Sequence, residues 1–228
     1  MHYAASRTNA EILYQHGADL FAKDKFGRTP LHTASKYGYP DVVQFLLSEG
    51  AAVNEPAKSG HTALLYILYC NSDEESYFLS KGAPPAENYE LELAKILLDH
   101  RADINVAPPD GETVLHGAAR LDDAELIRYL VEHGANLQAV DANGKTPLHN
   151  AACHANIEIV RYLINQGADT HAVTTAGQTT VHYACLAPLN LRLPSTSQGK
   201  TILEFIDEDE KWNWNAEGLV KANFTVLQ

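Results

Sequence analysis

Apolar residues recur along the chain in short blocks whose spacing is that of an α-helix. The clearest blocks are residues 42–47, 126–131 and 159–164, and in each the apolar positions share one side of a helix. Two residues separate each block from a Gly-Ala pair, and glycine readily takes the left-handed conformation that ends a helix. We therefore predict one helix in each block, ended in turn by Gly50, Gly134 and Gly167.

A second motif precedes these blocks and marks another helix. Runs of the form Gly-x-Thr-x-Leu/Val begin at Gly27, Gly60, Gly111, Gly144 and Gly177. The intervals between these glycines are 33, 51, 33 and 33 residues. Threonine is a good N-cap and proline suits the first helical position, where its missing N–H costs nothing. The repeating unit is therefore a pair of helices joined by loops.

This repeat resembles the ankyrin repeat family. The shared pattern is D-x-x-G-x-T-P-L-H-x-A-A, followed by a second helix that ends in L-L-x-x-G-A-D, and it covers roughly residues 1–187. The resemblance implies an all-α, L-shaped solenoid of stacked helix pairs with projecting β-turn fingers. It also implies that the histidine of the Thr-x-x-His motif bonds to the threonine and loop backbone and is structural.

We expect a single domain of about six repeats over residues 1–228. The repeats are expected at about 1–23, 24–56, 57–107 with an insertion at about 71–90, 108–140, 141–173 and a partial 174–198, before a C-terminal cap or tail at 199–228.

The pattern departs from regularity in three places. The first repeat is three residues short, which fits either an eroded cap or a fragment of a longer, multidomain protein. The insertion fits either a tolerated loop or a ligand-binding element. The acidic and aromatic segment 207–214 fits either a cap or a docking segment. In addition, Arg101 replaces a helix-ending glycine, so we expect that turn to differ locally.

Composition and charge narrow the class of protein. The 228 residues carry 29 acidic and 17 basic side chains, a net charge of −12, which disfavours nucleic acid as a partner. The first twenty residues lack the apolar core of a signal peptide, and no stretch is apolar enough to span a membrane. Three cysteines are a poor disulfide framework. We expect a cytoplasmic or nuclear protein.

Chemical motifs give no support for an enzyme, a metal or a cofactor. Gly199-Lys200-Thr201 lacks the glycine five positions earlier that a phosphate loop requires, because Pro194 stands there. The cluster His149, Cys153 and His154 has no fourth metal ligand nearby. Cys185, three residues after His182, occupies a small-residue position where we expect it to be buried and inert.

The favoured function is protein–protein recognition, as an adaptor, scaffold or inhibitor. The alternative is a small-molecule site or unusual enzyme between the insertion and the concave face, using Tyr66, Tyr69, His61 or Arg120. The resemblance implies partner contacts from finger tips and the exposed side of the first helices. The predicted partner-binding residues are Lys25, Phe26, Arg28, Lys36, Tyr37, His61, Tyr66, Tyr69, Asp110, Glu112, Arg120, Leu121, Asn143, Lys145, Asn150, His154, Gln178 and Tyr183, with Lys58 at a corresponding position. This set leans basic and aromatic, so we expect a groove for an acidic or mixed protein segment.

Overall fold

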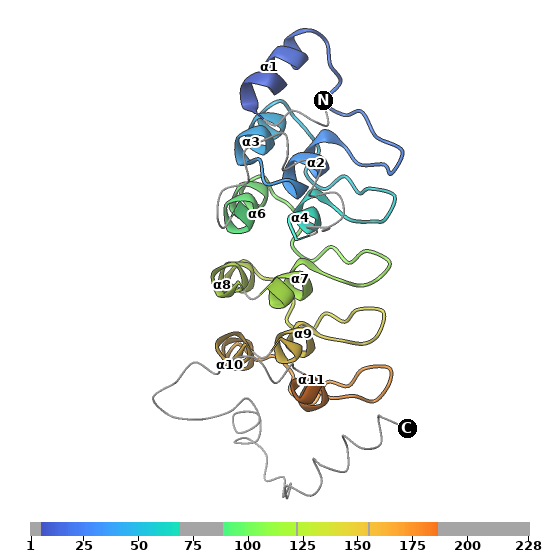
Figure 1. The fold of residues 1–228 in the computed structure, drawn as a ribbon, viewed down its shortest axis with the longest axis vertical. Helices are drawn as coiled ribbons and strands as arrows, with labels where there is room; N and C mark the ends of the chain where they lie inside the picture. Colours follow the sequence, from blue (N-terminus) through green and yellow to red (C-terminus); the bar gives the residue numbers. More distant parts are fainter. Residues whose placement is uncertain (1–5, 69–88, 122, 155, 187–228) are drawn as a thin grey trace, which may run out of the picture.

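A computed structural model describes residues 6–68, 89–121, 123–154 and 156–186, and all structural statements concern these ranges. They form two columns of helices with a row of loops beside them (Figure 1). The inner column, next to the loops, contains α2 (Pro30–Lys36), α4 (Ala63–Tyr66), α7 (Val114–Leu121), α9 (Pro147–Cys153) and α11 (Thr180–Leu186). The outer column contains α1 (Arg7–Gln15), α3 (Pro40–Ser48), α6 (Tyr89–Asp99), α8 (Ala124–Glu132) and α10 (Ile157–Asn165).

This arrangement confirms the predicted all-α solenoid. The described residues contain no β-strand, and the extended backbone is confined to the loops, where Val173 and Thr179 form a β-bridge. No helix among the described residues is long and apolar enough to cross a membrane.

The inner helices begin as predicted. Thr29 and Thr146 are extended N-caps, and a proline follows each at the start of its helix. The histidine three residues later accepts a hydrogen bond from the threonine N–H, at 3.0 Å for His32 and 3.1 Å for His149. These contacts satisfy a backbone donor that the helix leaves unpaired.

The outer helices bury one apolar side against the neighbouring repeats. The predicted blocks 42–47, 126–131 and 159–164 all lie within outer helices. Leu46, Leu97, Leu130 and Leu163, from four successive outer helices, are each 0% exposed. Burying a leucine contributes about 2 kcal/mol, so this column of leucines is a main source of stability.

Side-chain amides connect the loops that follow the outer helices. Asn54 donates to the carbonyl of Arg101 at 3.0 Å and accepts from the N–H of Asp103 at 2.7 Å. Asn105 and Gln138 make the equivalent pair of bonds to the next repeat. Each amide therefore fixes one repeat to the next at a turn that is otherwise exposed.

The turn at Arg101 has the same geometry as the glycine turns. Gly50, Gly134 and Gly167 have φ of 89°, 87° and 92°, and Arg101 has φ of 66°. The N–H of Arg101 donates to Leu98 at 2.9 Å, as that of Gly50 does to Leu47 at 3.1 Å. The expectation of a locally different turn was therefore wrong: the stack imposes the left-handed conformation on arginine.

Replacing Arg101 by glycine is therefore expected to stabilise the protein. The left-handed conformation costs a non-glycine residue roughly 1–2 kcal/mol. Glycine relieves this strain, but its larger conformational entropy in the unfolded chain cancels part of the gain in stability. We expect a gain of about 1 kcal/mol in the free energy of unfolding, measured by urea denaturation. The reverse exchange, Gly134→Arg, should cost a similar amount, and a loss of stability in Arg101→Gly would contradict the argument.

Several predicted features lie outside the described residues. These are residues 1–5, most of the insertion, the partial repeat beyond residue 186, and the C-terminal cap or tail. Of the residues assigned to the insertion, Tyr89 and Glu90 form the first turn of α6. The second helix of this repeat therefore includes two residues of the predicted insertion, and Tyr89 is buried.

Candidate partner-binding surface

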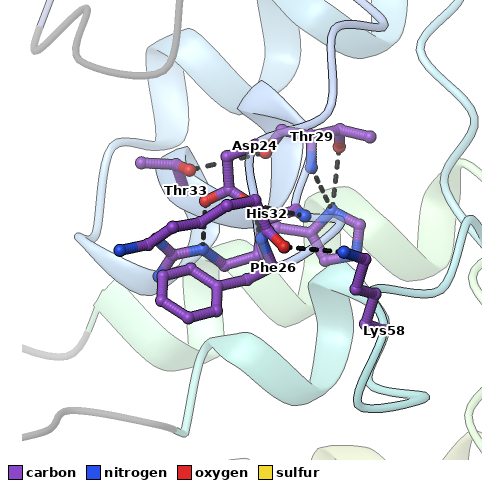
Figure 2. Close-up of polar contacts among 8 residues, drawn as sticks. Asp24, Phe26, Thr29, His32, Thr33 and Lys58 are labelled. Atoms are coloured by element: carbon purple, nitrogen blue, oxygen red, sulfur yellow. Dashed lines mark hydrogen bonds and ion pairs between the residues drawn. The ribbon is translucent and has the colours of Figure 1, made fainter.

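An aspartate closes the finger that precedes α2. Asp24 accepts hydrogen bonds from the N–H groups of Phe26 and Arg28, at 2.8 and 2.9 Å, and from Arg28 Nε at 2.7 Å (Figure 2). Burial acts to raise the pKa of this carboxyl, but the bonds from Arg28 and Phe26 outweigh it and the pKa is lowered. Asp141 closes its finger similarly, through the N–H groups of Asn143 and Lys145. These two fingers are thus closed loops of defined shape.

Three pairs of neighbouring fingers are joined by backbone hydrogen bonds. The N–H of Lys58 donates to the carbonyl of Phe26 at 3.0 Å, and Lys58 Nζ donates to the carbonyl of Lys25 at 2.8 Å. Farther along the stack, Ala142 donates to Asp110 at 2.7 Å and Thr175 donates to Asn143 at 2.8 Å. These bonds fix the positions of adjacent finger tips relative to each other.

Histidines connect the inner helices to the next finger. The Nδ1 atoms of His32, His116 and His149 accept from a threonine N–H, so their Nε2 atoms carry the proton. Each Nε2 donates to a carbonyl of the next finger, that of His61, Lys145 or Gln178. The predicted structural role of these histidines is confirmed.

Burial is the main cause of a lowered pKa at all three histidines. It lowers the pKa of His32 to about 4, and those of His116 and His149 move in the same direction. The third repeat has Leu65 at the equivalent position, and the hydroxyl of Thr62 is buried without a hydrogen-bond partner in the described structure. The histidine series is therefore interrupted in this repeat.

The predicted binding residues differ widely in exposure. Six are exposed: Lys25, Phe26, Asp110, Leu121, Asn143 and His154. Eight are partly buried: Arg28, Tyr37, Tyr66, Glu112, Arg120, Lys145, Asn150 and Gln178. Three are buried: Lys36, His61 and Tyr183. Tyr69 lies outside the described residues.

The three buried residues were expected on the exposed side, and they offer a partner little area. The ring of Tyr183 packs edge-on against His149 of the preceding repeat, with 5.3 Å between ring centroids. His61 packs near Tyr66 and lies 3.5 Å from the Asp110 carboxylate. Lys36 is buried, and its Nζ lies 5.4 Å from the centroid of the Tyr37 ring. Contacts with a neighbouring repeat therefore help to determine where the side chains of Tyr183 and His61 lie.

Phe26 is the most prominent aromatic residue of the fingers. Its side chain is 48% exposed. Lys25 Nζ and Arg28 Cζ lie 4.7 and 4.9 Å from the centroid of its ring, within cation–π range. An exposed aromatic ring between two cations is a typical anchor for a protein interface.

Two exposed apolar residues lie next to the later fingers and are not among the predicted binding residues. Val140 and Val173 are 56% and 58% exposed. Both occupy the position directly before the finger in consecutive repeats. The 33-residue register would therefore have identified them had apolar as well as charged positions been followed.

The alternative function, a small-molecule site or an unusual enzyme, would have to use a small set of polar side chains. Arg120 forms an ion pair with Glu112. Burial raises the pKa of the Cys185 thiol, the direction opposite to that which activates a nucleophile. Within the described ranges, no three His, Cys, Asp or Glu side chains are grouped so that they could hold a metal ion.

Three related proteins are each longer than the segment that matches this chain. Human protein phosphatase 1 regulatory subunit 27 is 43% identical over 54 residues, which are 22% of this chain and 35% of that protein. Ankyrin repeat and SOCS box protein 6 of Pongo abelii is 33% identical over 121 residues, 50% of this chain and 25% of that protein. Ankyrin repeat and KH domain-containing protein mask-1 of Caenorhabditis elegans is 33% identical over 104 residues, 45% of this chain and 3% of that protein. The chain thus spans about a third or less of these relatives.

The family model for ankyrin repeats in three copies matches residues 1–86, 85–174 and 140–192. These matches cover most of the chain and include every helix pair described above. Together with the histidine contacts, the closed fingers and the left-handed turns, they show that the chain belongs to the ankyrin repeat family.

Proposed function

We propose that this chain is a non-catalytic protein-binding module that acts as an adaptor, scaffold or inhibitor. Ankyrin repeats are protein-interaction modules, and the chain has three copies of the family model. The partner is held by the finger loops and inner helices. The observation that carries the proposal is the exposed Phe26 ring on fingers whose backbones are hydrogen-bonded to one another.

Rigidity favours binding by this surface. Aspartate-closed loops, bonds between fingers and the histidine contacts hold the backbone in one shape before a partner arrives. A preformed surface loses little conformational entropy on association, so more of the contact energy appears as affinity.

The names of two relatives support a regulatory or recruiting role. One is a regulatory subunit of a phosphatase and another combines ankyrin repeats with a SOCS box. We infer that the repeats of this chain select a partner for an activity that resides elsewhere. The proposal also includes a location in the cytoplasm or nucleus. The free thiols of Cys153 and Cys185 support such a reducing compartment.

The proposal is tested by affinity purification with quantitative mass spectrometry. Phe26→Ala combined with Tyr37→Ala removes two aromatic contacts from the finger face and should reduce recovery of the specific partner at least tenfold. Tyr129→Ala combined with Tyr162→Ala removes two partly buried aromatic residues from outer helices and should leave recovery unchanged. Thermal denaturation confirms that both variants are folded.

Equal recovery of the partner by wild type and by the folded Phe26/Tyr37 variant would refute the proposed surface. A loss confined to the Tyr129/Tyr162 control would move the interface to the outer helices.

A further inference from the structure

Positive charge on the finger side is concentrated in the second and third repeats. Arg28 is paired with Asp24, and Lys23 is paired with Glu55. Lys25 and Lys58 are both exposed and remain uncompensated by either pair. Lys58 Nζ donates to a backbone carbonyl, which fixes its position but leaves its charge intact.

The next two fingers have the opposite balance. Asp110, Glu112 and Asp141 are three acidic side chains, against the two basic side chains Arg120 and Lys145. Glu112 is paired with Arg120, and Asp110 is exposed. A negatively charged ligand is therefore attracted at one end of the finger row and repelled farther along it.

A proline separates these two groups of fingers. Where Lys58, Ala142 and Thr175 each donate an N–H to the preceding finger, the third and fourth fingers meet at Pro109, which has no N–H. Pro108 and Pro109 instead pack against Gly60. The second and third fingers therefore form one hydrogen-bonded pair, distinct from the group formed by the fourth to sixth.

Lys25 lies beside the exposed aromatic ring, and Lys58 lies beside the backbone of the same finger. Lys25 Nζ is 4.7 Å from the centroid of Phe26, while Lys58 Nζ is bonded to the carbonyl of the residue preceding Phe26. Figure 2 shows Lys58 next to the loop that contains Asp24 and Phe26. The pair of fingers thus presents two ammonium groups along one short stretch of backbone, with an exposed aromatic ring beside the first of them.

We propose that Lys25, Phe26 and Lys58 form a docking block for an acidic segment of the partner protein. Carboxylates of that segment contact the two lysines, and an apolar or aromatic side chain next to them packs on Phe26. The inference rests on the proposed function and adds the chemistry and position of the partner segment. The adjoining acidic fingers set its orientation, because its acidic end must lie over the second and third fingers.

The probe is a peptide selected from a random library displayed on phage. Selection on the wild-type chain should enrich peptides that combine several Asp or Glu residues with an apolar or aromatic residue. Selection on Lys25→Glu with Lys58→Glu should lose them. Lys95→Glu with Arg128→Glu makes the same charge change on outer helices and should enrich the same peptides as wild type.

A synthetic acidic peptide from that selection then gives the affinity, by fluorescence anisotropy. We expect the Lys25/Lys58 reversal to weaken binding at least tenfold, and Phe26→Ala to weaken it several-fold. Raising the salt concentration should weaken binding to wild type. A charge-reversed peptide, with Lys in place of Asp and Glu, should bind the reversed variant better than wild type. This rescue excludes loss of folding as the cause.

Enrichment of neutral or basic peptides on wild type, or equal binding of the acidic peptide by wild type and the Lys25/Lys58 variant, would overturn the inference. If Phe26→Ala with Tyr37→Ala still releases the cellular partner in that case, the proposed function stands without the acidic segment. Wild type is also offered an oligonucleotide with the same net charge as the acidic peptide. If it binds the oligonucleotide more tightly, the inference that the docking block binds a protein segment is wrong.

Discussion

Lowering the pH from 7.5 to 4.5 is expected to reduce the free energy of unfolding by about 2–3 kcal/mol through His32 alone. Burial lowers the pKa of this histidine from 6.5 to about 4. A difference of one pKa unit between folded and unfolded states is equivalent to about 1.4 kcal/mol. The unfolded chain therefore takes up a proton at pH values where the folded chain does not, and acid favours unfolding.

The geometry around His32 explains why the folded state resists the proton. Nδ1 accepts the Thr29 N–H at 3.0 Å, and Nε2 faces the His61 carbonyl at 3.2 Å. A proton on Nδ1 would end the first bond and place a charge in a buried site. The stabilising contribution is complete above about pH 6.5 and is lost as the pH falls toward the folded pKa.

His116 and His149 act in the same direction, because burial lowers both of their pKa values. Asp24 adds a further loss, since its lowered pKa makes it stabilising only when ionised, but that loss falls at a more acidic pH. Measurements between pH 7.5 and 4.5 therefore report mainly on the histidines.

Urea denaturation followed by circular dichroism at several pH values tests this expectation. His32→Gln should be less stable than wild type at pH 7.5, yet lose about 2–3 kcal/mol less than wild type on acidification. Parallel pH dependence of wild type and His32→Gln would show that His32 does not resist protonation.

The repeated backbone was predictable from the sequence because the same local rule recurs. Thr29-Pro30 and Thr146-Pro147 specify a helix start through N-cap and N1 preferences alone. The glycines at 50, 134 and 167 specify a left-handed turn in the same way. Each of these features depends on neighbours within a few residues, which is the information that a sequence displays directly.

The binding surface was less predictable because it depends on residues about one repeat away. Tyr183 was expected to face solvent, but its ring packs on His149, 34 positions earlier. Arg101 was expected to alter its turn, yet the Asn54 amide and the packed helix hold the ordinary geometry. Pro109 separates the third finger from the fourth because the residue at this position donates its N–H to the preceding finger in the other repeats. Contacts of this kind between residues of different repeats become visible only in the three-dimensional structure.

Gly111→Ala should destabilise the protein by about 3 kcal/mol, which is among the largest losses expected from adding one methyl group. Gly111 has φ of 73°, a left-handed conformation that costs a residue with a side chain roughly 1 kcal/mol or more. An added Cβ would also lie 2.8 Å from the Cα of Asp141 and 2.8 Å from the carbonyl oxygen of Val140. Overpacking of this kind typically costs a further 1–3 kcal/mol.

Gly134→Ala separates the two contributions. Gly134 has φ of 87°, but an added Cβ would have no neighbour within 4 Å. We therefore expect a loss of about 1 kcal/mol from backbone strain alone. The difference between the two variants, about 2 kcal/mol, measures how closely the fourth finger packs on the fifth.

The atoms that would clash with an alanine at position 111 belong to backbone, so no rotation of a side chain relieves the contact. The chain must instead separate the fourth and fifth fingers, which would lengthen the 2.7 Å bond from the Ala142 N–H to the Asp110 carbonyl. Amide hydrogen exchange should therefore show faster exchange at Ala142 in Gly111→Ala but not in Gly134→Ala. Equal stabilities of the two alanine variants, with unchanged exchange at Ala142, would mean that the fingers move apart at little cost. The rigid, preformed surface on which the proposed recognition depends would then lose its physical basis.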